Sequence, residues 1–234
     1  MNVVKALLLA TTAEMFVSVV APPKRATAGK ESIYKGQVFE FLVRYLAYLG
    51  CFLVSASAFS HSMLIFYRDG TSWIEPVVPW LCPSAPPTLD PLLRMTPRFL
   101  VGVALVAVGT TLRIGAYRAL GALFTFEVVL KEDHRLVTGG PYKFIRHPSY
   151  TGIALLLLGT HLIHFGQTGY VTYCDLDATP MAIFVNIWRL GSLFTVLSLY
   201  RRCGIEDAQL RERFGAEWDM YNKEVPYALA PYVY

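Results

Sequence analysis

The stretch GGPYKFIRHPSYTG, residues 139–152, lies between two long apolar segments of this chain. It places cations, an imidazole and two phenols at the mouth of a predicted membrane helix. Burying such groups is unfavourable by several kcal/mol unless a partner or ligand compensates, so ionisable residues at a membrane edge are candidates for function. The simpler alternative is a positively charged cytosolic loop that only orients the following helix. We interpret the stretch as the functional centre.

The composition of the whole chain indicates a membrane protein. Its 234 residues are 54% hydrophobic and only 16% charged, whereas soluble domains have about 25% charged residues. The net charge of +4 is modest and spread along the chain. Such a charge gives no indication of nucleic-acid binding, and we expect no nucleic-acid partner.

Five apolar segments are candidates for membrane helices, which need roughly 20 residues to cross a bilayer. They cover about residues 3–21, 38–67, 98–120, 150–165 and 180–200. The first begins with a basic residue, as signal peptides do, but Glu14 interrupts it, and we expect it to be retained as a helix. Arg113, near the end of the third segment, is expected to snorkel to the membrane surface.

Charged residues become frequent beyond Tyr200, and apolar side chains recur there at helical spacing, at Leu210, Phe214, Trp218 and Tyr221. This pattern predicts an amphipathic helix after the fifth segment. The predicted fold class is an all-α, polytopic membrane protein with about five transmembrane helices and a C-terminal amphipathic cytosolic helix. We expect two parts: residues 1–119 with the first three helices, and residues 120–234 with a cytosolic loop, helices four and five and the C-terminal helix.

The distribution of basic residues predicts the topology. Lysine and arginine are concentrated in residues 21–36, in residues 119–149 and in the tail after the fifth segment, which share one side if the chain crosses five times. The positive-inside rule places that side in the cytosol. The central stretch and the tail can therefore build one site. Cys82 and Cys174 fall on the opposite side, where a disulfide is conceivable.

Arg202 and Glu206 are four residues apart, hence on one face of the tail helix. If the tail meets the start of the fourth helix, this pair faces Arg146, His147 and Tyr150. Guanidinium groups suit an anionic substrate, a carboxylate suits a cationic group, and an aromatic ring suits a flat or cationic ligand. The alternative is that Arg202 and Glu206 only pair with each other on a solvated face.

Several other chemistries lack their motifs. The chain has no Gly-x-Ser-x-Gly, no Gly-x-x-x-x-Gly-Lys and no strand-borne Gly-x-Gly-x-x-Gly sequence. His161 and His164 are spaced as two metal ligands, but no carboxylate or cysteine completes a set, so no metal is expected.

Three blocks follow one another in the second half of the chain: HRLVTGGPY at 134–142, RHPSYTG at 146–152 and RxxxEDxxLxxxFGxxWxxYxxxVP at 202–226. In order and spacing they closely resemble the isoprenylcysteine carboxyl methyltransferases, which belong with other membrane methyltransferases such as phospholipid N-methyltransferases. The resemblance covers about residues 120–230. The chain departs from the family pattern at Asp207, where a second glutamate is usual, at Trp218, where tyrosine is usual, and at Gly204, which is often basic.

The resemblance implies that S-adenosylmethionine binds on the cytosolic side, between helices four and five and the tail. The implied cofactor contacts are Glu127, which replaces the usual amide, and His134, Arg135, Leu136, Val137, Tyr142, His147, Pro148, Ser149, Tyr150 and Glu206. Arg202 is implied to bind the substrate carboxylate. Arg146 is a second candidate for this catalytic role because of its charge and position.

The implied reaction is methylation of the C-terminal carboxylate of isoprenylated cysteine in CaaX-processed proteins. The substrates would be prenylated protein C-termini of the small-GTPase or mating-factor type, and the prenyl chain would enter from the membrane lipid. The implied location is the endoplasmic reticulum membrane, with a multi-pass topology and the active site facing the cytosol.

Three alternatives stay open. The acceptor could be a phospholipid amine or another lipid carboxylate, and an amine would need a base such as Glu206 or His147. Sterol reductases, which use NADPH, also carry an Arg-His-Pro-x-Tyr motif, although they are longer and have more spans. The last alternative is a non-catalytic membrane scaffold.

Overall fold

The computed structural model describes residues 2–21, 38–84, 86–123 and 135–231, and within these ranges the regular structure is helical. The α-helices are α1 (Asn2–Val20), α2 (Val38–Arg68), α3 (Val78–Leu81), α4 (Asp90–Leu93), α5 (Pro97–Leu120), α6 (Pro148–His164), α7 (Tyr170–Tyr173), α8 (Ala182–Phe214) and α9 (Ala216–Glu224). Short 3-10 helices are η1 (Ser72–Val77), η2 (Gly121–Leu123), η3 (Gly140–Lys143) and η4 (Leu176–Ala178).

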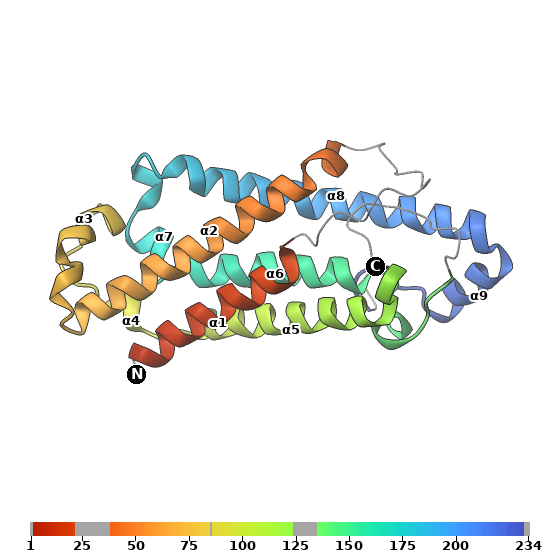
Figure 1. Cartoon of the computed structure of the whole chain (residues 1–234), viewed down its shortest axis with the longest axis horizontal. Helices are drawn as coiled ribbons and strands as arrows, with labels where there is room; N and C mark the ends of the chain where they lie inside the picture. Colours follow the sequence, from red (N-terminus) through yellow and green to blue (C-terminus); the bar gives the residue numbers. More distant parts are fainter. Residues whose placement is uncertain (1, 22–37, 85, 124–134, 232–234) are drawn as a thin grey trace.

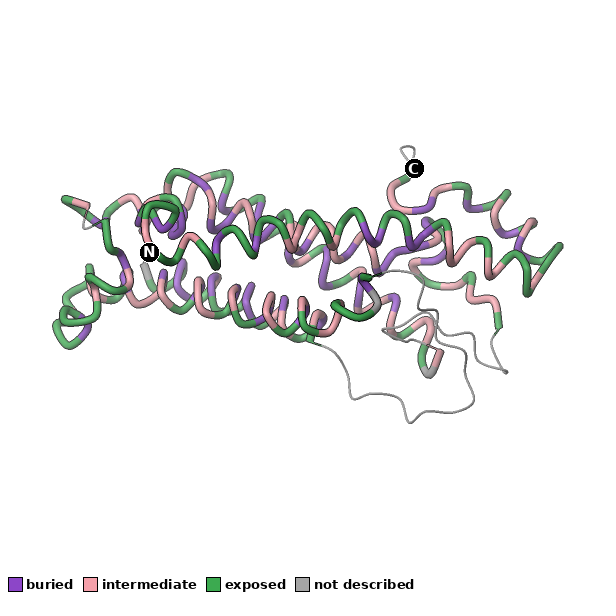
Figure 2. The backbone as a smooth tube through the Cα atoms, turned by 90° about the horizontal axis from the view of Figure 1, so that it is seen from above, coloured by how far each residue is buried: buried purple, intermediate pink, exposed green. Residues whose placement is uncertain are grey.

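The long helices run side by side and form an elongated bundle (Figure 1). Four of them, α1, α2, α5 and α8, are long and apolar enough to cross a membrane, and α6 is a fifth apolar helix of 17 residues. Buried residues follow the inner faces of the helices and exposed residues the outer faces (Figure 2). The predicted all-α, polytopic membrane fold is confirmed.

Glycines bring α5 and α6 into direct backbone contact. A Cβ atom on Gly102 would lie 2.8 Å from the carbonyl oxygen of Gly159, and one on Gly109 would lie 2.7 Å from that of Gly152. The two helices are antiparallel: Gly102, near the start of α5, contacts Gly159 in the second half of α6, and Gly109 contacts Gly152 in the first half. Small residues permit such close approach between membrane helices. This contact sets the start of α6 beside the second half of α5.

Basic side chains cap the C-termini of three helices, where carbonyl groups lack helical partners. Lys5 donates to the carbonyl groups of Leu92 and Arg94 at the end of α4. Arg98 donates to Leu162 and Phe165 at the end of α6, and Arg113 donates to Val19 in the last turn of α1. Arg113 is 2% exposed, so the prediction that it snorkels is wrong. It stays inside because carbonyl and hydroxyl groups of three helices accept its hydrogen bonds.

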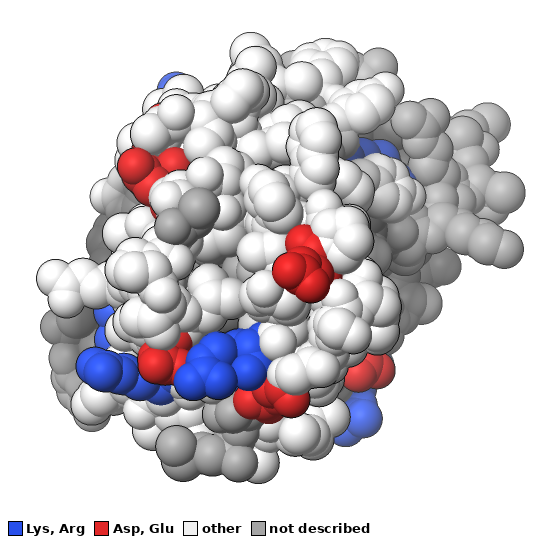
Figure 3. Space-filling model, turned by 90° about the vertical axis from the view of Figure 1, so that its left-hand side faces the viewer, with Lys and Arg blue, Asp and Glu red and all other residues white. Residues whose placement is uncertain are grey.

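A disulfide joins Cys82 after α3 to Cys174 after α7, 92 residues apart. It lies in an apolar cluster with Leu64, Leu92 and Tyr170. The pairing considered from the sequence is therefore present. This end of the molecule, seen in Figure 3, is mostly uncharged: a few acidic side chains stand alone, and basic and acidic ones lie next to each other along its lower edge.

The fifth membrane helix does not stop near Tyr200. α8 is 33 residues long and runs past Tyr200 to Phe214. Its C-cap residue is Gly215, whose φ of 53° disfavours any residue with a side chain. Residues 201–214 include good helix formers and no proline, so nothing interrupts the helix there. The change in composition at Tyr200 marks a change of surroundings within one helix. The predicted amphipathic helix is divided at Gly215 between the end of α8 and α9.

Candidate functional site

The candidate site lies at the end of the bundle opposite the disulfide, where α6 begins and the second half of α8 passes (Figure 1). Gly140, with a φ of 61°, turns the chain into η3. The chain then reaches His147, the N-cap residue of α6, and Pro148 occupies the first helical position. Proline fits there because the first turn of a helix has no use for its missing N–H.

Two neighbouring carboxylates of α8 organise the site. Glu206 accepts hydrogen bonds from the Tyr150 hydroxyl and from Arg202 Nε at 3.0 Å, and its Oε2 lies 3.4 Å from His147 Nδ1. Asp207 accepts from Arg146 Nη2 at 3.0 Å and lies 3.1 Å from His147 Nε2. The imidazole of His147 therefore bridges both carboxylates.

The charge of His147 follows from this arrangement. Burial by itself lowers the pKa of its imidazole, but the bonds and charges of Asp207 and Glu206 outweigh burial and raise that pKa to about 9. His147 is therefore an imidazolium at neutral pH. Burial, reinforced by the Glu206 carboxylate, raises the pKa of Tyr142, so its phenol stays neutral.

Aromatic rings close one side of the site. The rings of His147 and Tyr150 are stacked with centroids 5.5 Å apart and planes 2° apart. The guanidinium carbon of Arg202 lies 5.8 Å from the centre of the Tyr150 ring. Arg202 is only 4% exposed, so its pair with Glu206 is buried, and the alternative of an isolated pair on a solvated face is wrong.

The C-terminal tail after α9 covers the turn that precedes α6. The backbone N–H groups of Arg146 and His147 donate to the carbonyl groups of Tyr227 and Ala228, each at 2.9 Å. The Thr151 hydroxyl donates to Leu229 at 2.6 Å. Arg146 also donates to Val225, and the Tyr221 hydroxyl donates to the carbonyl of Tyr142. The tail thus fixes the backbone that carries Arg146 and His147.

The structure brings together five residues predicted for the site: Arg146, His147, Tyr150, Arg202 and Glu206. Tyr142 is buried nearby, whereas the Ser149 hydroxyl accepts a bond from Arg113, away from the carboxylates. Arg135 is exposed and Leu136 and Val137 are half-buried in the segment that leads to η3. Glu127 and His134 lie outside the described residues.

Sequence reasoning missed Asp207 as a site residue. Its carboxylate holds both Arg146 and His147. Its position next to Glu206 was a usable signal. Two adjacent carboxylates on one helix can both reach residues at the start of a neighbouring helix, as Glu206 and Asp207 of α8 do at the start of α6. Thr151 and the carbonyl groups of residues 227–229 were also missed, since main-chain acceptors leave no trace in side-chain patterns.

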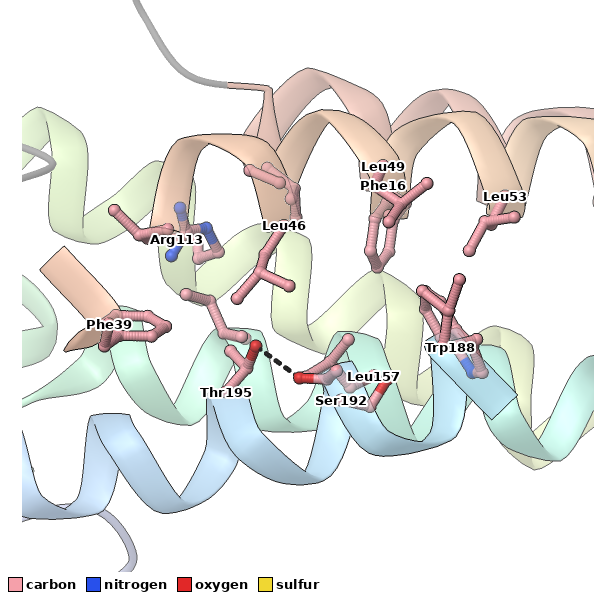
Figure 4. A pocket seen from close by; sticks show the side chains of 17 residues that line it. Phe16, Phe39, Leu46, Leu49, Leu53, Arg113, Leu157, Trp188, Ser192 and Thr195 are labelled. Atoms are coloured by element: carbon pink, nitrogen blue, oxygen red, sulfur yellow. Dashed lines mark hydrogen bonds between the residues drawn. The ribbon is translucent and has the colours of Figure 1, made fainter. Parts of the chain in front are cut away.

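An apolar cavity of about 80 Å³ lies within the bundle, between α1, α2, α5, α6 and α8 (Figure 4). The rings of Phe16 and Trp188 form part of its wall, with centroids 6.1 Å apart. Arg113 is the charged residue among its lining, and the Thr195 hydroxyl bonds to the Gly191 carbonyl of its own helix. The surface that faces the cavity is therefore mainly hydrocarbon.

The chain is similar in sequence to known proteins. The family model described as phospholipid methyltransferase matches residues 97–189, which run from α5 into α8. The chain is 29% identical over 127 residues to a probable protein-S-isoprenylcysteine O-methyltransferase of Oryza sativa subsp. indica, covering 53% of this chain and 57% of that protein. It is 30% identical over 125 residues to protein-S-isoprenylcysteine O-methyltransferase of Schizosaccharomyces pombe, covering 52% and 44%.

Protein-S-isoprenylcysteine O-methyltransferase of Homo sapiens is 29% identical over 140 residues, which cover 59% of this chain and 43% of the human protein. The matches thus span about half the length of these curated relatives. The fold itself is that of an all-α, polytopic membrane protein. Over about half of its length the chain is similar to protein-S-isoprenylcysteine O-methyltransferases.

Proposed function

We propose that this protein is an integral-membrane methyltransferase that transfers a methyl group from S-adenosylmethionine to the C-terminal carboxylate of isoprenylated cysteine in CaaX-processed proteins. The observation that carries the proposal is the buried cluster of Arg202, Glu206, Tyr150 and a cationic His147 at the start of α6. It combines a guanidinium for a carboxylate substrate with a carboxylate and rings for a cationic cofactor.

The charge of His147 favours a carboxylate acceptor. A carboxylate is already ionised at neutral pH and needs no general base, whereas methylation of an amine requires removal of a proton. With a pKa of about 9, His147 has no free lone pair to accept that proton at neutral pH. Glu206 is engaged by Tyr150, Arg202 and His147. The site is thus better suited to positioning than to proton removal.

The residues present fit S-adenosylmethionine by their chemistry. When bound, this cofactor supplies an electrophilic methyl group on a cationic sulfonium. The carboxylate of Glu206 would bind its cationic part, and Tyr150 and Tyr142 offer rings that stabilise positive charge or stack on a flat base. His147, Pro148 and Ser149 would contribute backbone contacts, and Glu127, His134, Arg135, Leu136 and Val137 complete the proposed cofactor contacts.

Arg202 would align the substrate carboxylate. Its Nε–H now donates to Glu206, so binding of a second carboxylate would share or replace that bond. Since methyl transfer neutralises opposite charges, a guanidinium that binds the ground state too tightly would slow it, and Arg202 would position the substrate more than activate it. Arg146 stays the second candidate, although its guanidinium already holds Asp207 and Val225.

The apolar cavity offers a place for hydrocarbon (Figure 4). A prenyl chain that enters laterally from the lipid would reach it between membrane helices. The proposed partners are accordingly prenylated protein C-termini of the small-GTPase or mating-factor type, and membrane lipid. The family resemblance favours the endoplasmic reticulum membrane as the location. The concentration of basic residues in the loop before α6 and in the tail favours a site that faces the cytosol.

A phospholipid or other lipid methyltransferase is the second candidate function. The description of the matching family model as phospholipid methyltransferase favours it. The same cofactor contacts would serve methylation of a prenylcysteine carboxylate and methylation of a lipid. The identity of the methyl-accepting substrate therefore distinguishes the two functions.

The test is methyl transfer from radiolabelled S-adenosylmethionine to N-acetyl-S-farnesylcysteine by the purified protein in detergent. We expect base-labile label in the product, because a methyl ester hydrolyses in base. Arg202→Ala should raise the KM for the carboxylate substrate at least about tenfold, the loss of one charge-assisted bond. Glu206→Ala should instead weaken cofactor binding, measured by calorimetry.

Arg189→Ala is the matched control, because Arg189 pairs with Asp177 away from the site, and it should leave both constants unchanged. Equal loss of cofactor binding in Arg202→Ala and Glu206→Ala would contradict this division of roles. Label transferred to phosphatidylethanolamine but not to the farnesylcysteine would move the second candidate ahead. A wild-type protein that binds no S-adenosylmethionine would refute both, and NADPH would be tried next.

A further inference from the structure

Arg113 occupies a place that is unfavourable for a charge. It lies in the second half of α5, inside the bundle, and is 2% exposed. Removing a guanidinium from water costs several kcal/mol unless its N–H groups are all bonded. Its partners are the carbonyl of Val19, the hydroxyl and carbonyl of Ser149 and the hydroxyl of Tyr117. These acceptors belong to three helices, α1, α6 and α5.

The bonds to α1 explain why the cation is tolerated. Arg113 Nε and Nη2 lie 3.0 and 2.8 Å from the carbonyl oxygen of Val19, and the Tyr117 hydroxyl donates to the same oxygen at 2.6 Å. Val19 lies in the last turn of α1, and the C-terminal end of a helix attracts positive charge. α1 is thereby fixed at its end to α5.

The bonds to α6 lead to the functional site. Arg113 Nη1 lies 3.0 Å from the Ser149 hydroxyl and 3.3 Å from the Ser149 carbonyl. Ser149 stands between His147 and Tyr150, which bind the two carboxylates of α8. A Cβ atom on Gly152 would lie 2.7 Å from Arg113 Cγ, so only glycine leaves room for the arginine to reach this turn.

We propose that Arg113 is a positioning residue for the methyl-transfer site: it holds the first turn of α6 against the end of α1 and thereby sets the places of His147 and Tyr150. For its part in catalysis the inference rests on the proposed function. The N-terminal end of a helix repels a cation, so the bond to Ser149 is kept against the helix dipole. Since the N–H groups of Arg113 are bonded to protein, they are not available to bind the substrate carboxylate.

Lys5 offers a matched comparison within the same molecule. It is a fully buried base that donates to the carbonyl groups of Leu92 and Arg94 at 2.6 and 2.8 Å, at the other end of α1. Arg113→Met and Lys5→Met each remove a buried cation together with the hydrogen bonds that it donates to main-chain carbonyl groups. A purely structural role for Arg113 predicts that both variants change the site equally.

The first readout needs no cofactor. Hydrogen–deuterium exchange of the full-length protein in detergent, followed by mass spectrometry, reports opening of the peptide that spans residues 147–153. We expect exchange there to rise about tenfold in Arg113→Met and to stay within about twofold of wild type in Lys5→Met, because only the former releases the first turn of α6. Ser149→Ala removes only the hydroxyl that accepts from Arg113 and should give a smaller rise in exchange of this peptide. This variant tests the inference if Arg113→Met fails to fold.

The second readout is the dissociation constant of S-adenosylmethionine, measured per folded protein. We expect it to rise at least about tenfold in Arg113→Met, since a small displacement of binding groups has large effects, and to stay within about twofold in Lys5→Met. Equal effects of the two variants, or an unchanged constant in Arg113→Met and Ser149→Ala, would overturn the inference. If exchange changes as expected but the wild type binds no S-adenosylmethionine, the proposed function fails while the positioning of α6 stands.

Discussion

His147 shows most directly how single residues make this site. Its ring nitrogens lie 3.4 Å from Glu206 and 3.1 Å from Asp207, in a buried position. The pair of carboxylates raises the pKa of the imidazole to about 9 from the usual value near 6.5. In the folded protein, His147 is therefore a structural cation that joins α6 to α8.

This predicts a pH dependence of stability. A group whose pKa is raised on folding stabilises the folded state below its unfolded pKa, and the stabilisation is lost as the pH rises through the folded pKa. For His147 the loss spans the range from about pH 6.5 to about pH 9 and amounts to at most about 3 kcal/mol. Unfolding of the protein in detergent, followed at several pH values, should show this decline.

The variant His147→Gln should be less stable at pH 6.5 and should have a flatter profile up to pH 9. An identical slope in wild type and variant would assign the decline to other groups.

At the scale of elements, the α5–α6 pair carries the site. Gly109 faces Gly152 so closely that a Cβ would meet the opposite carbonyl. This contact aligns the two helices and sets the start of α6 opposite Arg113. The sequence showed small residues in the third apolar segment, but it did not show which helix they contact, because glycine spacing is the same whatever the partner.

Gly109→Ala should therefore destabilise the protein by about 1–3 kcal/mol, the usual effect of overpacking. Gly204→Ala is the matched control: it lies in α8 with open space around the added Cβ. Since alanine is the better helix former, this variant should be neutral or more stable by up to about 1 kcal/mol. Chemical denaturation in detergent compares the two. A similar loss in both would mean that the α5–α6 contact is not the cause.

At the scale of the whole molecule, the two ends of the bundle differ in chemistry. One end holds the charged site and the C-terminal tail, and the other holds the disulfide between Cys82 and Cys174. Disulfides persist in oxidising compartments, and the proposed function requires a site that faces the cytosol. The two ends of the bundle therefore suit opposite sides of a membrane, as the proposed orientation requires.

Replacement of Cys82 and Cys174 by alanine should lower the free energy of unfolding by about 2–4 kcal/mol, because the disulfide closes a long loop. Binding of S-adenosylmethionine should not change, since the disulfide lies at the other end. Alkylation under non-reducing conditions checks the bond itself: the two cysteines should react only after reduction. Labelling of both without reductant would rule out the disulfide in the isolated protein.

The sequence by itself determined the all-α, polytopic membrane fold class, the long helices and the polar blocks of the site. Hydropathy and helix-forming residues act locally, so α1, α2, α5 and α6 begin and end within about two residues of their predicted bounds. The resemblance, carried by the blocks at 134–152 and 202–226, indicated the family. The division at residue 119 and the assigned roles of the site residues stay predictions.

Only the tertiary structure decided which polar groups meet. Asp207 binds His147 from 60 residues away, and Arg113 binds Val19 from 94 residues away. Such pairs depend on which helices pack together and on how far the helices are shifted along each other. Glycine contacts, the unbroken length of α8 and the tail that folds back on α6 determine this arrangement. A buried arginine and a snorkelling one look alike in sequence, because the difference lies in the carbonyl groups that other helices bring to it.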